Sequence, residues 1–148
     1  MHNQAIILFY ALLVLSVSAA LWKGGAPERT GAAIVIGTLA LEWVGRAVVP
    51  PNFNSIYPVA VIIDAVATAS YGALSLYARR AWPIWATALQ LLSLTSHFAE
   101  GIEPSHPGIY FTMKSGPTLM VQVVLLLGTL FHQRRLRRFG RDPAWMGW

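Results

Sequence analysis

Long apolar segments separated by chain breakers constrain the fold of this sequence more than any other feature. The 148 residues hold five of them, at about 4–22, 31–49, 57–78, 82–99, and from 107 or 117 to 133. A helix of about 20 mostly apolar residues crosses the hydrocarbon core of a bilayer. The sequence therefore predicts an all-α polytopic membrane protein, a single domain over 1–148 that forms a bundle of about five transmembrane helices.

Glycine, proline and a pair of arginines separate these segments. The first ends in KGGAP at 23–27, the second ends in PPNFN at 50–54, and Arg79 with Arg80 divides the third from the fourth. A stretch rich in Pro and Gly precedes the fifth and leaves its start open. Small residues close the first segment and resemble a signal-peptide cleavage site, but no Lys or Arg precedes that segment. We therefore expect a retained first helix.

Composition excludes several classes of function. The chain contains no cysteine, which excludes disulfides, thiolate metal sites and thiol nucleophiles. It also shows no glycine-rich phosphate loop. The net charge of +5 would favour nucleic acid as a partner of a soluble protein, but five of the eleven basic residues follow the last apolar segment. Their position favours membrane orientation and contact with anionic lipid, and no nucleic acid is expected as a partner.

Basic residues gather in alternate connections. Nine of the eleven lie in the first and third connections or after the last segment, namely Lys23, Arg29, Arg79, Arg80, Arg134, Arg135, Arg137, Arg138 and Arg141. Positively charged loops stay in the cytoplasm, so the pattern predicts an outside amino terminus, an inside carboxyl terminus and a basic cytoplasmic tail at 134–148. The expected location is a bacterial inner (plasma) membrane. Glu28 and Asp142 then fall in the inner connection and the tail.

Two acidic residues occur inside the apolar segments at a similar depth. Glu42 and Asp64 each lie about 10 Å below the outer boundary, at about 1.5 Å per residue. A charge inside the membrane costs roughly 2.5 to 3.5 kcal/mol and normally faces the bundle interior or a cavity. Glu42 has Arg46 one turn later, whereas Asp64 has no charged residue within two turns. Asp64 must be protonated, meet Arg46 or Lys114 across helices, or bind something that is not protein. A structural clamp between the second and third helices is the alternative.

Helical spacing places further polar residues on single faces of the predicted helices. These positions include Asp64, Thr68, Tyr71 and Ser75 in the third segment, Gln90 and His97 in the fourth, and Gln122 in the fifth. The first segment offers only scattered serines, so we expect it to be peripheral to a core made by the other four. Alanines at 65, 69 and 73 form a strip of small residues that favours close approach of another helix.

Four potential metal ligands recur every three residues after the fourth segment: His97, Glu100, Glu103 and His106. All four side chains can bind a divalent metal. Known helical metal motifs place two histidines at i,i+4 or use paired Glu-x-x-His segments, and neither pattern is present in full. A solvated acidic loop after a helix-ending histidine is the competing interpretation.

Three functional hypotheses follow. The leading one is a non-enzymatic membrane protein that binds or moves a small ligand, proton or cation through a polar pocket open to the outer face; a complete transporter of this size would need a homodimer. The second is an accessory subunit packed against a larger membrane complex. The third is a metal-dependent membrane enzyme with its site at 97–106. Residues expected to bind a ligand or ion are Glu42, Arg46, Asp64, Thr68, Tyr71, His97, Glu100, Lys114 and Gln122.

Overall fold

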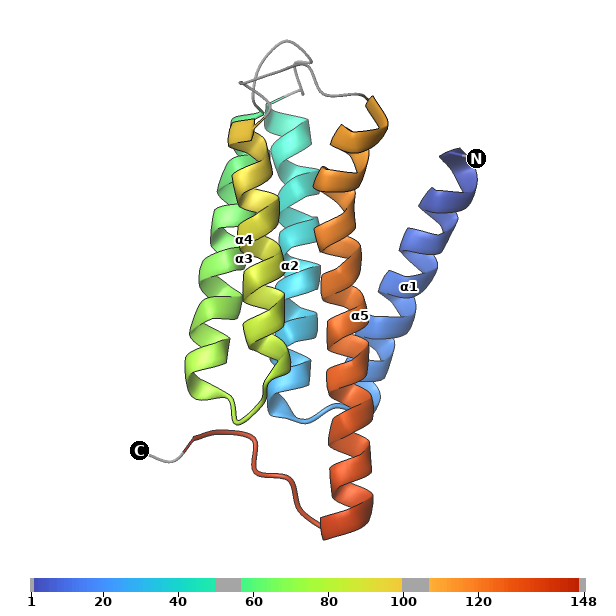
Figure 1. The fold of residues 1–148 in the computed structure, drawn as a ribbon, viewed down its shortest axis with the longest axis vertical. Coiled ribbons are helices and arrows are strands. Elements are labelled where there is room, and N and C mark those ends of the chain that lie inside the picture. The colour runs from blue at the N-terminus through green and yellow to red at the C-terminus, as the bar shows by residue number, and fades with distance from the viewer. Residues whose placement is uncertain (1, 50–56, 100–106, 147–148) are drawn as a thin grey trace.

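The chain forms a helical bundle (Figure 1). The computed structural model describes residues 2–49, 57–99 and 107–146, without the side chains at 2, 3, 5, 99 and 107–115. Within these residues the helices are α1 (His2–Lys23), α2 (Ala26–Val48), α3 (Pro58–Tyr77), α4 (Trp82–Ala99) and α5 (Pro107–Phe139). We call the end where α1 meets α2 and α3 meets α4 the lower end, and the end where α5 begins the upper end, as drawn in Figure 1.

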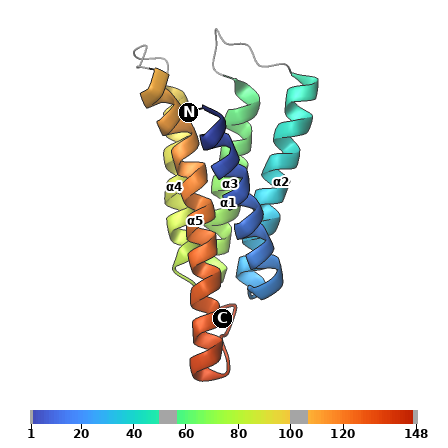
Figure 2. The same ribbon diagram turned by 90° about the vertical axis from the view of Figure 1, so that its right-hand side faces the viewer.

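The contacts between helices define their arrangement in the bundle. Helix α4 packs between α3 and α5, α2 packs on α3, and α1 packs on α5 and α2. Figure 1 shows α1 at the edge of the bundle, leaning away from α5 toward the upper end, and Figure 2 gives the view at right angles. The expectation that α1 is peripheral is wrong for its second half, because Ser16 and Ala20 are fully buried there. These small side chains, one turn apart, let α1 approach closely.

The second helix begins earlier than expected. It starts at Ala26 and not at 31, although Pro27 was interpreted as a breaker. Proline is tolerated in the first helical turn, where its missing N–H would have no partner within the helix. The Glu28 carboxylate also accepts the backbone N–H of Gly25 at 3.0 Å, which satisfies one free donor at this helix end. By contrast, α3 and α4 agree with their expected bounds to within one residue.

The fifth helix begins at Pro107, the earlier of the two expected starts, and contains Pro117 in its interior. It also continues past 133 to Phe139, so the expected basic tail at 134–148 is helical in its first part. Arginine is a good helix former, and no breaker occurs before Gly140. Gly140 has a φ of 68° and donates its N–H to the Leu136 carbonyl at 2.9 Å. A glycine in the left-handed backbone conformation commonly follows the last residue of a helix.

The outside of the bundle is suited to lipid. Four helical segments are long and apolar enough to cross a membrane: Ile6–Lys23, Ala26–Val48, Pro58–Tyr77 and Gly116–Phe139. Large apolar side chains face outward, and Trp22 and Trp43 are 87% and 80% exposed. Water-soluble monomers rarely expose extensive apolar patches of this kind. The chain thus has the features of a helical membrane protein.

Trp82 belongs to the buried core and lies in the lower half of the bundle. Its indole meets the Tyr71 ring edge to face, with centroids 6.3 Å apart. Gly31 on α2 and Gly128 on α5 form the two sides of a slot, since a Cβ at either position would overlap the indole. Leu74 and Leu125 belong to the same core. Trp82 therefore fixes the spacing of three helices at the lower end.

Candidate functional site

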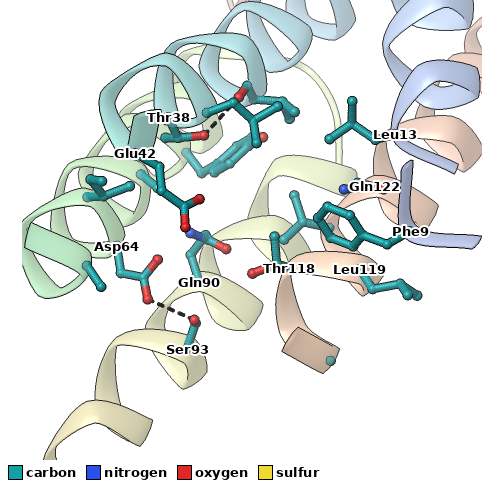
Figure 3. A pocket seen from close by; sticks show the side chains of 18 of the residues that line it. Phe9, Leu13, Thr38, Glu42, Asp64, Gln90, Ser93, Thr118, Leu119 and Gln122 are labelled. Carbon is teal, nitrogen blue, oxygen red and sulfur yellow. Dashed lines mark hydrogen bonds between the residues drawn. The ribbon is translucent and has the colours of Figure 1, made fainter. Parts of the chain in front are cut away.

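A cavity of about 620 Å³ is bordered by all five helices and includes residues near their upper ends. We call it the upper cavity. The charged and amide side chains that line it are Glu42, Arg46, Asp64, Gln90, His97 and Gln122. Helices α2 to α5 supply these groups, while α1 contributes Ile6, Phe9, Tyr10 and Leu13. Figure 3 shows Glu42, Asp64, Gln90 and Ser93 at one side of the cavity and Phe9, Leu13 and Leu119 at the other.

Asp64 is held by two side chains of α4. Its Oδ2 accepts the Ser93 hydroxyl at 2.9 Å and lies 2.9 Å from His97 Nε2. The carboxyl side chain is 17% exposed and the imidazole 4% exposed. Arg46, one of the partners considered from the sequence, pairs with Glu42. The side chain of the other, Lys114, lies outside the described residues. Among the described residues, Asp64 pairs with His97 on the neighbouring helix. Ser93 was not singled out, although it lies one turn before His97 on the same face.

Glu42 and Arg46 form the expected pair one turn apart. Arg46 Nε and Nη2 lie 3.2 and 2.5 Å from Glu42 Oε1. The two side chains are 44% and 59% exposed, so this is a pair at the mouth of the cavity and not a buried one. Exposed pairs of this kind contribute at most about 1 kcal/mol to stability. Both residues line the same cavity as Asp64, as their similar depth predicts.

Gln122 on α5 presents an unsatisfied acceptor. The residue is 1% exposed and lines the upper cavity. Its Oε1 is the one buried side-chain nitrogen or oxygen without a hydrogen-bond partner among the residues that the structure describes. A buried acceptor without a partner costs about 1–3 kcal/mol, and such groups are rare in proteins. A ligand that donates a hydrogen bond would remove this cost.

The other expected site residues fall in different places. Tyr71 lines the cavity and donates its hydroxyl to the Gly31 carbonyl at 3.3 Å, whereas Thr68 donates to the backbone carbonyl of Asp64 and does not line the cavity. Glu100, Glu103 and His106 lie outside the described residues, as does the side chain of Lys114. Of the four expected metal ligands, the structure therefore describes His97 alone, and its side chain pairs with Asp64. Elsewhere in the described chain, no group of three potential ligands gathers.

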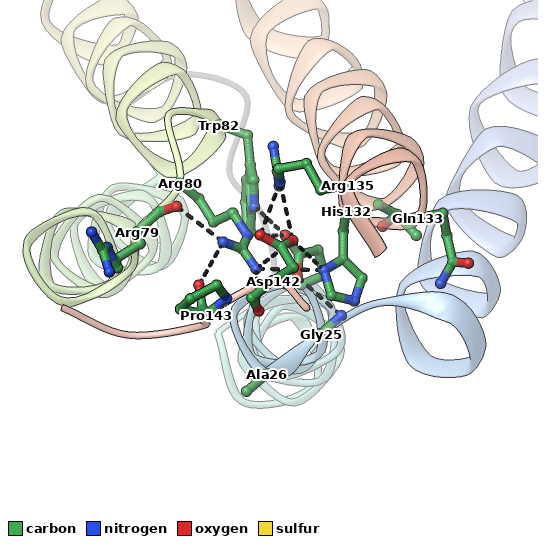
Figure 4. A network of polar contacts seen from close by, with 12 residues as sticks. Gly25, Ala26, Arg79, Arg80, Trp82, His132, Gln133, Arg135, Asp142 and Pro143 are labelled. Carbon is green, nitrogen blue, oxygen red and sulfur yellow. Dashed lines mark hydrogen bonds and ion pairs between the residues drawn. The ribbon is translucent and has the colours of Figure 1, made fainter. Parts of the chain in front are cut away.

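A second group of polar residues lies at the lower end and was not expected. We call Glu28, Arg80, Trp82, His132 and Asp142 the lower cluster (Figure 4). Glu28 accepts the Trp82 indole N–H at 3.0 Å and the Arg80 Nε–H at 3.3 Å. Its side chain is fully buried and that of Arg80 is 2% exposed. The prediction that Glu28 lies in the inner connection was wrong, because α2 starts at Ala26 and includes Glu28, whose side chain is buried.

Asp142 connects the chain after α5 to this cluster. Its carboxylate lies 2.8 Å from Arg80 Nη2, 2.6 Å from His132 Nδ1 and 3.0 Å from Arg135 Nε. Burial raises the pKa of Asp142, but the hydrogen bonds from His132 and Arg135 and the charges of Arg80 and Arg135 outweigh it. The net result is a pKa below the usual value for this residue type.

Backbone contacts complete the attachment of this segment. Arg79 N–H donates to the Ala144 carbonyl at 3.1 Å, and Met146 N–H donates to the Tyr77 carbonyl at 2.8 Å. Arg80 Nη1 also donates to the Pro143 carbonyl at 2.8 Å. Residues 140–146 therefore pack under the connection between α3 and α4, as Figure 1 shows.

The lower cluster and the upper cavity differ in how their polar groups are satisfied. In the lower cluster, each of the charged side chains Glu28, Arg80 and Asp142 has a partner of opposite charge. In the upper cavity an acceptor has no partner and two carboxylates border the cavity.

No protein-family model, curated protein or solved structure matches this chain.

Proposed function

We propose that the protein is an integral membrane protein that binds or moves a small ligand, proton or cation in the upper cavity. The observation that carries the proposal is the Asp64 carboxylate, which Ser93 and His97 hold in the wall of a cavity of about 620 Å³ that Gln122 also lines. A carboxylate inside a membrane normally serves a ligand, an ion or a proton pathway. Ligand pockets of proteins are usually about 300–1,000 Å³, and the upper cavity has that size.

The charges of the cavity favour a positively charged occupant. Arg46 is paired with Glu42, so these two groups cancel. Asp64 then contributes one net negative charge when His97 is neutral and donates its Nε2–H to the carboxylate. A cation bound beside Asp64 offsets the cost of keeping that charge in the membrane.

The geometry around Asp64 favours binding over covalent catalysis. In a Ser-His-Asp triad the histidine lies between the serine and the carboxylate, where it removes the serine proton. Here Ser93 and His97 both contact the same oxygen, Asp64 Oδ2. Ser93 consequently has the carboxylate and not the imidazole as its partner, which supports the non-enzymatic hypothesis.

We further propose that all five helices cross a bacterial inner membrane, with the amino terminus outside and the carboxyl terminus inside. Helix α4 falls short of the apolar content of the other four because of Gln90, Ser93 and His97, but it packs between two spanning helices. Nine of the eleven Lys and Arg residues lie at the lower ends of α1 and α2, in the connection between α3 and α4, in the last turns of α5 and in the tail. Exposed Arg134, Arg137 and Arg138 would there meet anionic headgroups. The upper cavity would then open toward the outer face.

One observation favours the role of an accessory subunit or a homodimer. The alanines at 65, 69 and 73 are exposed on the outside of α3 and contact no other helix closely enough to be buried. A strip of small residues lets another transmembrane helix approach. Native mass spectrometry of the protein purified in mild detergent distinguishes a monomer, a homodimer and a complex with another subunit.

Two substitutions by asparagine, one in the upper cavity and one in the lower cluster, test the proposed function when their effects are compared. Asp64→Asn removes the charge of the upper cavity and keeps the size of the side chain, so it should abolish ligand binding with little loss of stability. Asp142→Asn makes the same chemical change in the lower cluster, so it should lower the melting temperature and leave binding intact. The measurements are native mass spectrometry for co-purified ligand and melting curves in detergent with and without Na⁺, K⁺ and ammonium salts. Ligand or salt effects that persist in Asp64→Asn would contradict the proposal.

A further inference from the structure

The upper cavity has a polar side and an apolar side. We infer that its ligand is an amphipathic organic amine, with a protonated nitrogen that carries N–H groups and an apolar body of several carbon atoms. This inference rests on the proposed function and specifies the substrate class of the same site.

The polar side accepts hydrogen bonds from a cation. Glu42 and Asp64 approach it from α2 and α3, and Gln90 lies between them in Figure 3. Asp64 Oδ2 is engaged by Ser93 and His97, and Asp64 lines the cavity. Carboxylate oxygens attract a protonated amine both by charge and by hydrogen bonding. An anionic ligand would meet the carboxylate of Asp64, whereas the charges of Glu42 and Arg46 cancel.

The apolar side extends the site beyond an inorganic ion. Phe9 and Leu13 of α1 and Leu119 of α5 face the polar side groups across the cavity in Figure 3. A proton or a bare metal cation would leave these side chains against water in a volume of about 620 Å³. An apolar body of a ligand gains about 25 cal/mol for each Å² that it removes from water. The apolar side of the cavity therefore favours a cation that carries a large apolar group.

Gln122 adds a requirement for a hydrogen-bond donor. Gln122 lines the cavity from α5, and its buried Oε1 has no hydrogen-bond partner. A quaternary ammonium ion carries no N–H and leaves this acceptor unsatisfied, whereas a primary or secondary amine can satisfy it. A site built to hydrogen-bond a ligand discriminates strongly against analogues that lack the donor. The cavity should thus prefer amines with N–H groups over their trimethylated counterparts.

Binding of matched probes to the full-length protein in lipid nanodiscs tests the inference. The probes are phenylbutylammonium, its trimethylammonium analogue, phenylbutanoate and methylammonium, titrated by calorimetry at neutral pH. Phenylbutylammonium should bind at least about tenfold more tightly than each of the other three, which corresponds to roughly 1.4 kcal/mol. The phenylbutyl body is shared by the first three probes, so their differences report the head group.

Three variants assign the contacts. Asp64→Asn should reduce phenylbutylammonium affinity at least about tenfold. Gln122→Leu keeps the volume and removes the acceptor, so it should weaken the amine and leave the melting temperature unchanged or raised. Phe9→Ala should weaken phenylbutylammonium and leave methylammonium unaffected. Leu8→Ala is its control, because Leu8 is 62% exposed on the outside of the same helix.

The outcomes separate the inference from the proposed function. If methylammonium or Na⁺ binds as tightly as phenylbutylammonium, and does so through Asp64, the cavity binds cations but the inferred class is wrong. Tighter binding of the trimethylammonium probe or of phenylbutanoate overturns the inference in the same way. If none of these ions binds, and melting curves show a folded protein, both the inference and the proposed cation site fail. Should Asp64→Asn prevent folding, Gln122→Leu and Phe9→Ala still decide the question.

Discussion

Glu28 is the residue on which the lower cluster depends most. Its carboxylate is fully buried and meets the Arg80 guanidinium, the Trp82 indole and the Gly25 amide. Removing one partner of a buried ion pair leaves the other charge uncompensated in a medium of low dielectric. The arginine remains paired with Asp142, but it loses half of its neutralising charge.

We predict that Glu28→Gln lowers the free energy of unfolding by about 3 kcal/mol. Chemical unfolding in mild detergent, followed by tryptophan fluorescence, measures the change. Glu42→Gln is the matched control, because it removes the same charge from a half-exposed pair worth less than about 1 kcal/mol. Equal effects of the two substitutions would show that burial of the Glu28–Arg80 pair has no energetic weight.

Two glycines of α2 differ in what surrounds them, which allows a second comparison. A Cβ at Gly31 would overlap the Trp82 ring, whereas a Cβ at Gly37 would find no heavy atom within 4 Å. We predict that Gly31→Ala destabilises the protein by about 1–3 kcal/mol, because a packed slot has no room for a methyl group. Gly37→Ala should stabilise it by up to about 1 kcal/mol through helix propensity. The melting temperatures of the two variants should shift in opposite directions. A higher melting temperature for Gly31→Ala would contradict the tight fit of Trp82 against Gly31.

At the scale of elements, the segment after α5 is attached to the bundle by charge as well as by backbone. Asp142 faces Arg80, Arg135 and His132, and Glu28 lies on the other side of Arg80. The folded-state pKa of Asp142 lies below its unfolded value of about 3.9. The stabilising contribution is therefore complete above that unfolded value and is lost as the pH falls through the folded-state pKa.

The lowered pKa of Asp142 predicts how the stability of the protein changes with pH. The difference in melting temperature between the wild type and Asp142→Asn should be constant from neutral pH down to about pH 4, and should shrink below it. Melting curves of both proteins over this range provide the measurement. A difference that first appears or grows on acidification would contradict the assigned direction of the pKa change.

Helix boundaries show how local signals work and where they fail. The bounds of α3 and α4 follow from apolar length and from the breakers beside them. For α2 the breaker Pro27 stands in the first turn, where proline is allowed, so the helix start was placed too late. For α5 the arginines after the apolar segment extend the helix, because charge does not end a helix but Gly140 does.

At the scale of the whole molecule, the bundle differs between its two ends. The lower end holds a glycine-lined tryptophan and a fully paired cluster of charges. The upper end holds a cavity with an unsatisfied acceptor. The slot around Trp82 and the paired charges therefore lie at the end where the basic residues gather, and the upper cavity lies toward the opposite end.

The charge distribution predicts the orientation of the molecule. We expect a reporter that is active only in the cytoplasm to work when fused to the carboxyl terminus, because nine of the eleven Lys and Arg residues lie toward that end of the bundle. A reporter that is active only outside the cytoplasm should fail at the same position. Fusions within the connection between α1 and α2 provide an independent check, and the opposite pattern at both positions would overturn the orientation.

The sequence by itself determined the features that depend on neighbours along the chain. Apolar length and breakers predicted the helices, and the spacing of Glu42 and Arg46 by four predicted their contact. Depth along the helices also placed Asp64 and Glu42 at one level, where both border the upper cavity.

Tertiary structure alone decided which distant residues meet. His97 is 33 residues from Asp64, and Arg80 is 52 residues from Glu28. Helical periodicity gives the face on which a side chain lies, but not which helix packs against that face or how far each helix is rotated. The pairing of Asp64 with His97 and the burial of Glu28 follow from those rotations, which are set by side-chain packing between helices, including the fit of Trp82 between two glycines.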